Sequence, residues 1–160
     1  MRIVVLGAGG VGGYFGAKLA RAGADITFVA RGAHLAAIRA EGLRVRSLIE
    51  GESSVKVTAV EETMGLAPAD IVLLTVKAYD TKTVLERARP VVGPDTAVIT
   101  LQNGVESVEL IDRVFGAGHA VGGAAYIFAV IAAPGVIEHR LLGRIAFGEM
   151  DGRQTPRAER

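Results

Sequence analysis

The sequence predicts an α/β fold in which helices cover both faces of a mainly parallel sheet, with added antiparallel strands at its edge. Two observations support this prediction. Short runs of Ile, Val, Leu and Ala alternate with stretches whose apolar residues recur at helical spacing, as in successive β-α-β units. The chain also opens with R-I-V-V-L followed by G-A-G-G-V-G-G, the pattern of a buried strand that enters a glycine-rich turn before a helix. Together they indicate the Rossmann-type, doubly wound fold.

Size and composition restrict the classes of function. The chain has 160 residues, of which 50% are apolar and 22% charged, so one domain with its own core is expected. A net charge of +1 with scattered basic residues argues against nucleic-acid binding. Without cysteine there is no disulfide or thiolate site, and no other metal-ligand or Ser/His/Asp spacing is evident. No apolar run approaches the ~18 residues of a membrane helix, so we expect a cytoplasmic protein.

Gly7, Gly9 and Gly12 have the G-x-G-x-x-G spacing of a dinucleotide-binding turn. The first allows a tight turn, the second lets a phosphate approach the backbone, and the third lets the helix pack closely on the strand. The helix over residues 10–22 would present free N–H groups and its positive dipole end to the anion. A glycine turn that serves only packing is the alternative. We favour a cofactor site formed by Gly7, Ala8, Gly9, Gly10, Val11 and Gly12.

The residue after the second strand decides between the two nicotinamide dinucleotides. Gly23 ends the first helix, and residues 26–30 form an almost wholly apolar strand. Sites that prefer NAD place Asp or Glu about 20 residues beyond the glycines, where it accepts from the ribose 2′-hydroxyl. Here the strand ends in Arg31, whose planar guanidinium suits a 2′-phosphate. An arginine that only caps a solvated strand end is the alternative, and we favour NADP.

The next part of the chain, residues 32–60, is predicted to lie at the periphery of the domain. Residues 32–40 have the spacing of a short amphipathic helix. The runs 43–48 and 54–60 are polar and alternating, so we expect both to be strands at the sheet edge.

The central sheet then resumes. Residues 71–76 and 97–101 are apolar enough to be strands that are covered on both faces. Between them, Asp80 and Thr81 predict the N-cap of a helix that Pro90 ends.

Lys77 and Asn103 each follow a predicted central strand. Ligands bind beyond the carboxyl ends of strands in open α/β sheets, so both residues are candidates for the site. For Lys77 we favour a cofactor or active-site role over an ordinary solvated lysine. Asn103-Gly104 would normally predict a hairpin, but the apolar residues after it have helical spacing. We therefore assign the Asn103 amide to a nicotinamide ribose or a substrate carbonyl, with a purely geometric role as the alternative.

The last third of the chain predicts the antiparallel part of the sheet. Residues 120–131 are almost entirely apolar and indicate a long or bent strand, in which Tyr126 is expected to be a core residue. A turn at residues 134–135 leads into two short antiparallel strands, 136–140 and 144–148.

These elements define the expected domain organisation. Residues 1–150 form an NADP-binding domain, and the polar residues 151–160 form a linker or loose tail. His34 and His119 have no carboxylate or second histidine nearby in sequence, so we expect both at the surface or in loops. For His139 we expect a structural role.

The ordered motifs G-A-G-G-V-G-G-Y-F-G, F-V-A-R, T-V-K-A, L-Q-N-G-V, G-V-I-E-H and F-G-E resemble the amino-terminal half of the ketopantoate reductase (2-dehydropantoate 2-reductase) family. The resemblance implies NADPH-dependent reduction of 2-dehydropantoate to pantoate, on the route to pantothenate and coenzyme A. It places the cofactor loop on residues 7–12, the 2′-phosphate arginine on Arg31 and a lysine after the fourth strand on Lys77. It places an asparagine near both nicotinamide and substrate on Asn103, and a further backbone contact on Ala129.

The same resemblance implies that this chain is half an enzyme. Members of the family have a second, helical domain that carries the general-acid lysine and the residues that hold the substrate. The sequence ends at Arg160, so residues 151–160 are expected to lead toward that domain, and we assign no catalytic residue within the chain. The expected partners are a small 2-oxo acid and either a second copy of the chain or a carboxy-terminal domain. Two alternatives stay open: a stand-alone NADP-binding sensor or regulatory module without catalysis, and a reductase of another 2-oxo acid.

Overall fold

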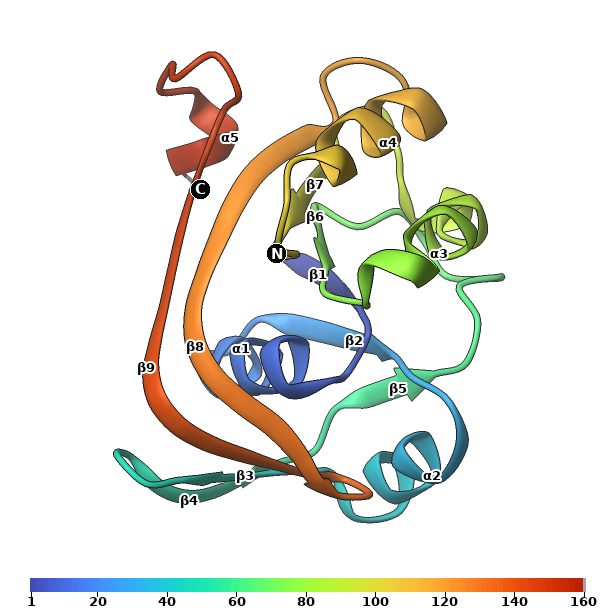
Figure 1. Ribbon diagram of the computed structural model, residues 1–160. Coiled ribbons are helices and arrows are strands. Elements are labelled where there is room, and N and C mark those ends of the chain that lie inside the picture. The colour runs from blue at the N-terminus through green and yellow to red at the C-terminus, as the bar shows by residue number, and fades with distance from the viewer. Residues whose placement is uncertain (160) are drawn as a thin grey trace.

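The structure is a computed structural model that describes residues 1–159, and these form one nine-stranded sheet with helices on both faces (Figure 1). The strands are β1 (Arg2–Leu6), β2 (Asp25–Val29), β3 (Leu43–Ser47), β4 (Gly51–Val55), β5 (Thr58–Val60), β6 (Ile71–Leu74), β7 (Ala97–Thr100), β8 (Ala120–Ala133) and β9 (Val136–Gly148). The α-helices are α1 (Gly10–Arg21), α2 (Gly32–Glu41), α3 (Thr81–Arg87), α4 (Glu106–Phe115) and α5 (Pro156–Glu159), and Ala78–Asp80 and Arg89–Val91 form 3-10 turns.

The order of the strands confirms the predicted fold class. It is β4-β3-β9-β8-β7-β6-β1-β2-β5, and the run from β5 to β8 is parallel throughout. Renumbered along the chain, those parallel strands have the order 3-2-1-4-5-6 of a Rossmann-type sheet. The order reverses at β1, so a crevice opens between the ends of β1 and β6. The remaining strands β9, β3 and β4 continue the sheet with antiparallel pairs at β8–β9 and β3–β4.

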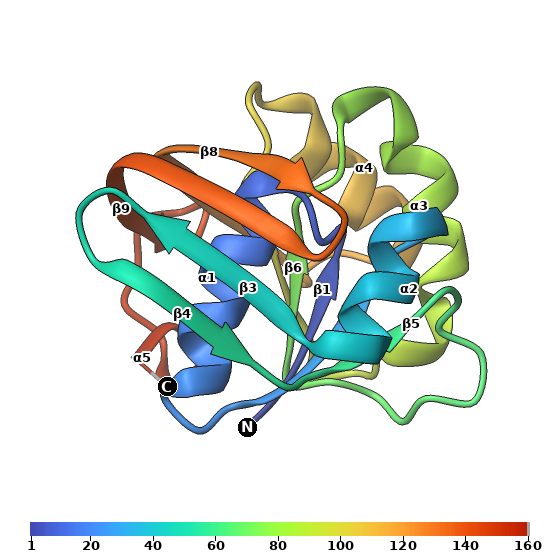
Figure 2. The ribbon, with the colours of Figure 1, turned by 90° about the horizontal axis from the view of Figure 1, so that it is seen from below.

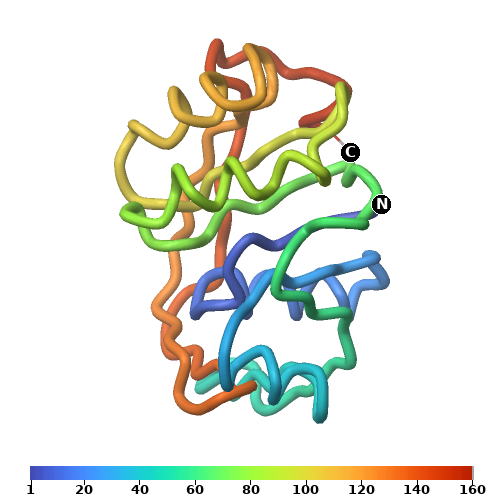
Figure 3. The backbone as a smooth tube through the Cα atoms, turned by 90° about the vertical axis from the view of Figure 1, so that its right-hand side faces the viewer, coloured from blue at the N-terminus to red at the C-terminus, as the bar shows by residue number. Residues whose placement is uncertain are grey.

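The strands β1, β2, β6, β7 and β8 of the parallel region contribute to two cores. In β1, the side chains of Ile3 and Val5 belong to the cluster that includes α1 and α2, while Val4 and Leu6 face the cluster that includes α3 and α4. Figure 3 shows these helix pairs on opposite sides of the parallel strands. Because both faces are covered, the strands are apolar at nearly every position, as the sequence indicated.

Helix α1 is enclosed rather than lying on one sheet face. The long hairpin of β8 and β9 bends around it, and β3 and β4 cover its remaining side (Figures 1 and 2). Six consecutive residues, 12–17, are buried as a result. Small residues permit this: a Cβ on Gly13 would lie 2.7 Å from the Ile137 side chain, and one on Gly16 would lie 2.4 Å from the Phe28 ring.

Two strand predictions need correction. Residues 54–60 are not one edge strand, because β4 ends at Val55 and β5 pairs with β2 at the opposite end of the sheet. Residues 56–57 suffice to connect the two ends because the sheet curls around α1 and brings its edges together. The sequence has no glycine or proline there to mark the break.

The second correction concerns residues 136–148, which form the single strand β9 rather than two short strands. The pairing with β8 shifts at Leu142 and Gly143, where φ is 63° and 122°. A side chain at Gly143 would collide with Tyr14, because its Cβ would lie 2.4 Å from the tyrosine hydroxyl.

Tyr126 is not a core residue. Residues of β8 such as Ile127 and Ala129 face α1, so Tyr126 and Phe128 point to the outer face of the hairpin and are 44% and 49% exposed. The Arg144 guanidinium lies 4.7 Å from the centroid of the Tyr126 ring. The prediction failed because β8 is apolar on both faces and therefore shows no alternation.

His139 is a structural residue, as expected. It is fully buried, and its ring centroid lies 4.1 Å from that of Tyr14. Its Nε2 lies 3.1 Å from the Leu141 carbonyl oxygen and its Nδ1 lies 2.8 Å from the Ser47 hydroxyl. A carbonyl can only accept, so Nε2 carries the proton and Nδ1 accepts from Ser47. The imidazole thereby joins β9 to the turn after β3.

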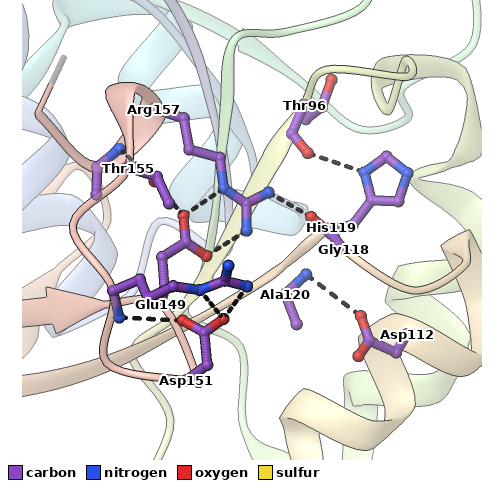
Figure 4. Close-up of polar contacts among 11 residues, drawn as sticks. Thr96, Asp112, Gly118, His119, Ala120, Glu149, Asp151, Thr155 and Arg157 are labelled. Atoms are coloured by element: carbon purple, nitrogen blue, oxygen red, sulfur yellow. Dashed lines mark hydrogen bonds and ion pairs between the residues drawn. The ribbon is translucent and has the colours of Figure 1, made fainter.

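The segment after β9 is anchored to the body of the domain (Figure 4). Arg157 of α5 donates to both carboxylate oxygens of Glu149 and to the Gly118 carbonyl. Thr155 also donates to Glu149, and these hydrogen bonds, led by those from Arg157, lower the pKa of Glu149 to about 2. Nearby, His119 is held by a hydrogen bond between its Nδ1 and the Thr96 carbonyl. Within the predicted linker or tail, residues 151–160, Thr155 and Arg157 are thus hydrogen-bonded to Glu149 and Gly118.

Within residues 1–159, no helix combines the length and the apolar character that crossing a membrane requires.

Candidate functional site

The glycine loop, residues 7–12, connects β1 to α1 at the carboxyl edge of the sheet. Gly7 has φ +103°, a conformation that favours glycine. A Cβ on Gly12 would lie 2.1 Å from the Gly7 carbonyl oxygen and 2.3 Å from the Thr75 hydroxyl, so only glycine lets α1 start this close to the strands. A Cβ on Gly9 would have no neighbour within 4 Å. The loop therefore packs tightly through Gly7 and Gly12 and presents open backbone at Gly9.

A groove of about 420 Å³ runs along this edge, over the carboxyl ends of β1, β2 and β6. It is the size of a small-molecule site, and it lies where ligands bind in doubly wound sheets. The predicted residues in its wall are Gly7, Ala8, Gly9, Gly10, Val11, Arg31, Lys77 and Ala129. Most of the sequence-predicted site is therefore brought together in one place.

Asn103 and Gly12 lie outside the wall of the groove. Gly12 is packed beneath the loop, against Thr75. Asn103 follows β7, one strand further along the sheet, and its side chain is exposed at the same edge. It lies beyond the part of the groove that the glycine loop and Arg31 form.

The amino end of α1 gives the groove its anion-binding character. The first turn of α1 contains no acidic residue, and its N-cap, Gly9, has no side chain to satisfy the free N–H groups. These N–H groups and the helix dipole favour a negatively charged ligand at the loop.

β8 closes one side of the groove next to the glycine loop. A Cβ on Gly10 would lie only 2.0 Å from the Ala129 carbonyl oxygen. Gly10 is thus required for the close passage of β8 across the start of α1, a role that the sequence motif alone did not indicate.

Arg31 and Asp80 form an ion pair across the groove. The Arg31 Nη2 lies 3.2 Å from the Asp80 Oδ2. Arg31 follows β2 and Asp80 follows β6, so the two residues come from opposite sides of β1. Asp80 stands at the predicted N-cap position of α3, but its side chain makes no capping hydrogen bond and pairs with Arg31 instead.

Further charged and polar side chains in the wall were not predicted. They are His34, Glu61, Glu62, Thr63, Thr75, Tyr79, Asp80 and Arg87. The carboxylates of this set offset the cations Arg31, Lys77 and Arg87, so the positive character of the site is concentrated at the helix terminus and not spread over the groove.

His34 is the most informative of these residues. It was expected at the surface or in a loop, but it lies half-buried on α2. Its Nε2 lies 2.7 Å from the Ala8 carbonyl oxygen, and its Nδ1 lies 3.0 Å from the Gly135 amide nitrogen. The partners are 26 and 101 positions away along the chain, so no local pattern could have revealed them.

Gln102 organises the segment that carries Lys77. Its Nε2 donates to the Val76 carbonyl at 2.6 Å and lies 2.8 Å from the Thr81 hydroxyl. The same amide therefore holds the chain on both sides of residues 77–80. Its Oε1 is buried and has no hydrogen-bond partner among residues 1–159.

A second hollow, of about 250 Å³, lies at the opposite edge of the sheet near Met1, Asp70 and Arg157. No residue of the glycine loop lines it. The groove at the carboxyl edge is therefore the candidate site.

Residues 3–152 match the family model described as Ketopantoate reductase PanE/ApbA. The chain is 36% identical over 179 residues to a 2-dehydropantoate 2-reductase of Mesorhizobium japonicum, an alignment covering 98% of this chain and 54% of the relative. It is 38% identical over 159 residues to the 2-dehydropantoate 2-reductase of Archaeoglobus fulgidus, covering 99% and 50%. The crystal structure of the 2-dehydropantoate 2-reductase from Geobacter metallireducens superposes with a TM-score of 0.91 at 35% identity, covering 99% and 52%. The chain spans about half the length of these relatives.

Proposed function

We propose that this chain, which belongs to the ketopantoate reductase family, is the NADP(H)-binding domain of a reductase that converts 2-dehydropantoate to pantoate. One observation supports the proposal above all: the groove is lined by the glycine loop after β1, by Arg31 after β2 and by Lys77 after β6. Because β1 lies between β2 and β6 in the sheet, the amino end of α1 has a cation on each side. One edge thus offers a site for a pyrophosphate and cations on both sides of it.

The residues present fit a phosphorylated dinucleotide. In this proposal the glycine loop holds the pyrophosphate, with the open backbone at Gly9 allowing close approach. Arg31, at the end of β2, holds the 2′-phosphate through its planar guanidinium. Lys77 and the backbone of Ala129 complete the cofactor contacts.

The chemistry would be hydride addition to the ketone of a 2-oxo acid. The bound reduced nicotinamide supplies the hydride, and this domain binds the cofactor and orients its nicotinamide. Asn103, exposed at the end of β7, is the residue that we assign to the nicotinamide ribose and the substrate carbonyl. The resulting alkoxide must be protonated in place.

We assign that proton donor to the part of the relatives that this chain does not cover. Lys77 is the lysine of the groove wall, and we place it against the cofactor. The proposal therefore predicts a chain that binds NADPH but does not turn over ketopantoate at an enzymatic rate. The alternative, a binding module without catalysis, also predicts NADPH binding without turnover for this chain. The two hypotheses make different predictions only when the remaining half of a relative is added.

The test is calorimetric titration of the purified chain with NADPH and NADH. We expect NADPH to bind more tightly, and Arg31→Ala to remove most of that preference. Addition of the carboxy-terminal half of a relative, as a separate chain or a fusion, should restore ketopantoate reduction. An NADH preference would contradict the cofactor assignment, and rapid turnover by the chain alone would contradict the assignment of the proton donor.

A further inference from the structure

We propose that His34 is a positioning residue for the glycine loop, because its imidazole orients the Ala8–Gly9 peptide so that the Gly9 N–H faces the groove. The inference rests on the proposed function, since it takes the loop to bind the phosphates of a dinucleotide. Nothing in the glycine motif itself requires this histidine.

The imidazole connects three elements of the site. It projects from α2 into the wall of the groove, with Nε2 2.7 Å from the Ala8 carbonyl oxygen of the glycine loop. Its Nδ1 lies 3.0 Å from the amide nitrogen of Gly135, in the turn between β8 and β9. His34 thus ties the loop to the hairpin that bends around α1.

These two contacts fix the protonation state of the ring. A backbone N–H can only donate, so Nδ1 must accept from Gly135. A carbonyl can only accept, so Nε2 must carry a proton and donate to Ala8. Only the neutral imidazole with its proton on Nε2 makes both hydrogen bonds. A second proton, on Nδ1, would face the Gly135 N–H and break that contact.

The contact with Ala8 has a directional consequence for the cofactor loop. The peptide bonds of residues 1–159 are trans, so the carbonyl of Ala8 and the N–H of Gly9 point in opposite directions. With the carbonyl held toward α2 by His34, the Gly9 N–H points away from it. The open space beside the Gly9 Cα gives an approaching phosphate access to this donor. His34 therefore orients the Gly9 N–H that would bind a phosphate, without contacting the ligand itself.

The surroundings of the ring matter for its response to pH. Neither residues 7–12 of the loop nor residues 134–135 of the turn carry a charge. On α2 itself the charged residues are Arg39 and Glu41, and Arg39 is occupied by a hydrogen bond to the Ala59 carbonyl. The charged groups that share the groove with His34 are Arg31, Glu61, Glu62, Lys77, Asp80 and Arg87.

The experiment is calorimetric titration with NADP⁺ and NAD⁺ between pH 5.5 and 8, because oxidised dinucleotides are stable in acid. At pH 8 we expect His34→Leu to weaken both ligands about tenfold (~1.4 kcal/mol), without changing their ratio, because the phosphates at the loop are common to both. His34→Gln supplies an amide that donates and accepts but does not titrate. It should bind within about threefold of the unmodified chain at pH 8.

The pH profile distinguishes positioning from a general structural role. A second proton on Nδ1 would break the contact with Gly135 that holds the ring in place, so the unmodified chain should lose affinity for NAD⁺ on acidification. His34→Gln should lose less, and the ratio of the two affinities should approach one or invert near pH 5.5. NAD⁺ carries no 2′-phosphate, so this comparison is free of that group's own titration.

Three outcomes decide the matter. Equal affinity of His34→Leu and the unmodified chain, or identical pH profiles for the unmodified chain and His34→Gln, would overturn the positioning role while leaving the proposed function intact. Failure of the unmodified chain to bind either dinucleotide would overturn both. If thermal melting shows that His34→Leu does not fold, the comparison with His34→Gln decides alone.

Discussion

The guanidinium of Arg31 lies 3.2 Å from the carboxylate of Asp80, and the two residues reach each other across the strand that carries the glycine loop. The Arg31 side chain is 80% exposed, so the pair is held in solvent and contributes little to the free energy of folding. Its importance is for binding. The cation that we assign to the 2′-phosphate of NADPH already has an anionic partner.

Asp80→Asn should therefore tighten NADPH binding. The change removes a negative charge beside the 2′-phosphate and frees Arg31 to pair with it. An exposed charge at this distance is worth about 1 kcal/mol, so we expect a gain of about threefold to tenfold at low salt. The gain should shrink as ionic strength rises, whereas NADH affinity should change little. Calorimetry at two salt concentrations measures both effects.

The matched control is Glu62→Gln, which removes a carboxylate from the same groove at a position with no ion pair to Arg31. An equal gain in the control would mean that the total charge of the groove matters and the pair does not. Weaker NADPH binding by Asp80→Asn would mean that Asp80 orients Arg31 rather than competing for it.

Gly9→Ala and Gly10→Ala should separate the roles of neighbouring glycines. A Cβ at position 10 would lie 2.0 Å from the backbone oxygen of Ala129, which no side-chain rotation can relieve. We expect Gly10→Ala to lower the free energy of unfolding by about 2 kcal/mol or more, despite the higher helix propensity of alanine.

Gly9→Ala should instead leave stability unchanged or slightly raised. Gly9 has φ −72° and ψ −167°, which alanine adopts without strain, and its Cβ would have no neighbour within 4 Å. The added methyl group would, however, occupy the space that we assign to a phosphate, so NADPH binding should fall about tenfold or more. Urea unfolding and calorimetry on both variants test this contrast. A loss of stability in Gly9→Ala would place it among the packing glycines.

The parts of the fold that could be predicted depend on local pattern. The run from β1 to Arg31 is specified by an apolar strand, three spaced glycines and a second apolar strand, all within one crossover unit. The site residues His34 and Gln102 escaped prediction because their partners are distant in sequence, at Gly135 and at Val76 and Thr81. A hydrogen bond of this kind leaves no periodic signal along the chain.

The sheet edge was mispredicted for a related reason. The alternation through Val55 and Val57 is that of one strand, and both side chains are partly buried against the same core. Only the curl of the sheet around α1 brings its two ends, β4 and β5, close enough for residues 56–57 to connect them. That curl follows from the small residues of α1 and from the length of β8 and β9, and it is a property of the whole domain.

Gln102→Leu should weaken dinucleotide binding by loosening the segment after β6. The amide of Gln102 holds the Val76 carbonyl and the Thr81 hydroxyl, on either side of Lys77. Leucine has a similar volume but no donor, so the Val76 carbonyl would lose a hydrogen bond worth about 1 kcal/mol. We expect NADPH binding to be about fivefold weaker and the free energy of unfolding to fall by about 1 kcal/mol.

Coupling to Lys77 checks that interpretation. If Gln102 acts by placing Lys77, then Gln102→Leu should have little further effect on affinity in a Lys77→Ala background. Additive losses in the double variant would show that the two residues act independently.

Glu149 should make the stability of the domain depend on acid. Hydrogen bonds from Arg157 and Thr155 lower the pKa of Glu149 to about 2, from an ordinary value of 4.5. A carboxyl group whose pKa is lower in the folded state stabilises that state above its unfolded pKa. Its contribution should therefore be complete above about pH 4.5 and should disappear as the pH falls toward 2.

Glu149→Gln tests this contribution. The Glu149 side chain is only 8% exposed and its partner Arg157 is 25% exposed, so the pair is shielded from solvent. We expect the variant to unfold with about 2 kcal/mol less free energy at pH 7, the range of hydrogen bonds to charged groups. Near pH 2 most of this difference should be gone, since the pH has then reached the pKa of Glu149 in the folded state and the carboxyl group is already protonated in the unfolded state. Asp151→Asn is the matched control, because Asp151 pairs with Arg153 at the exposed surface and should change the midpoint little. A stability difference between Glu149→Gln and the unmodified chain that is as large at pH 2 as at pH 7 would show that packing around residue 149, and not its charge, anchors α5.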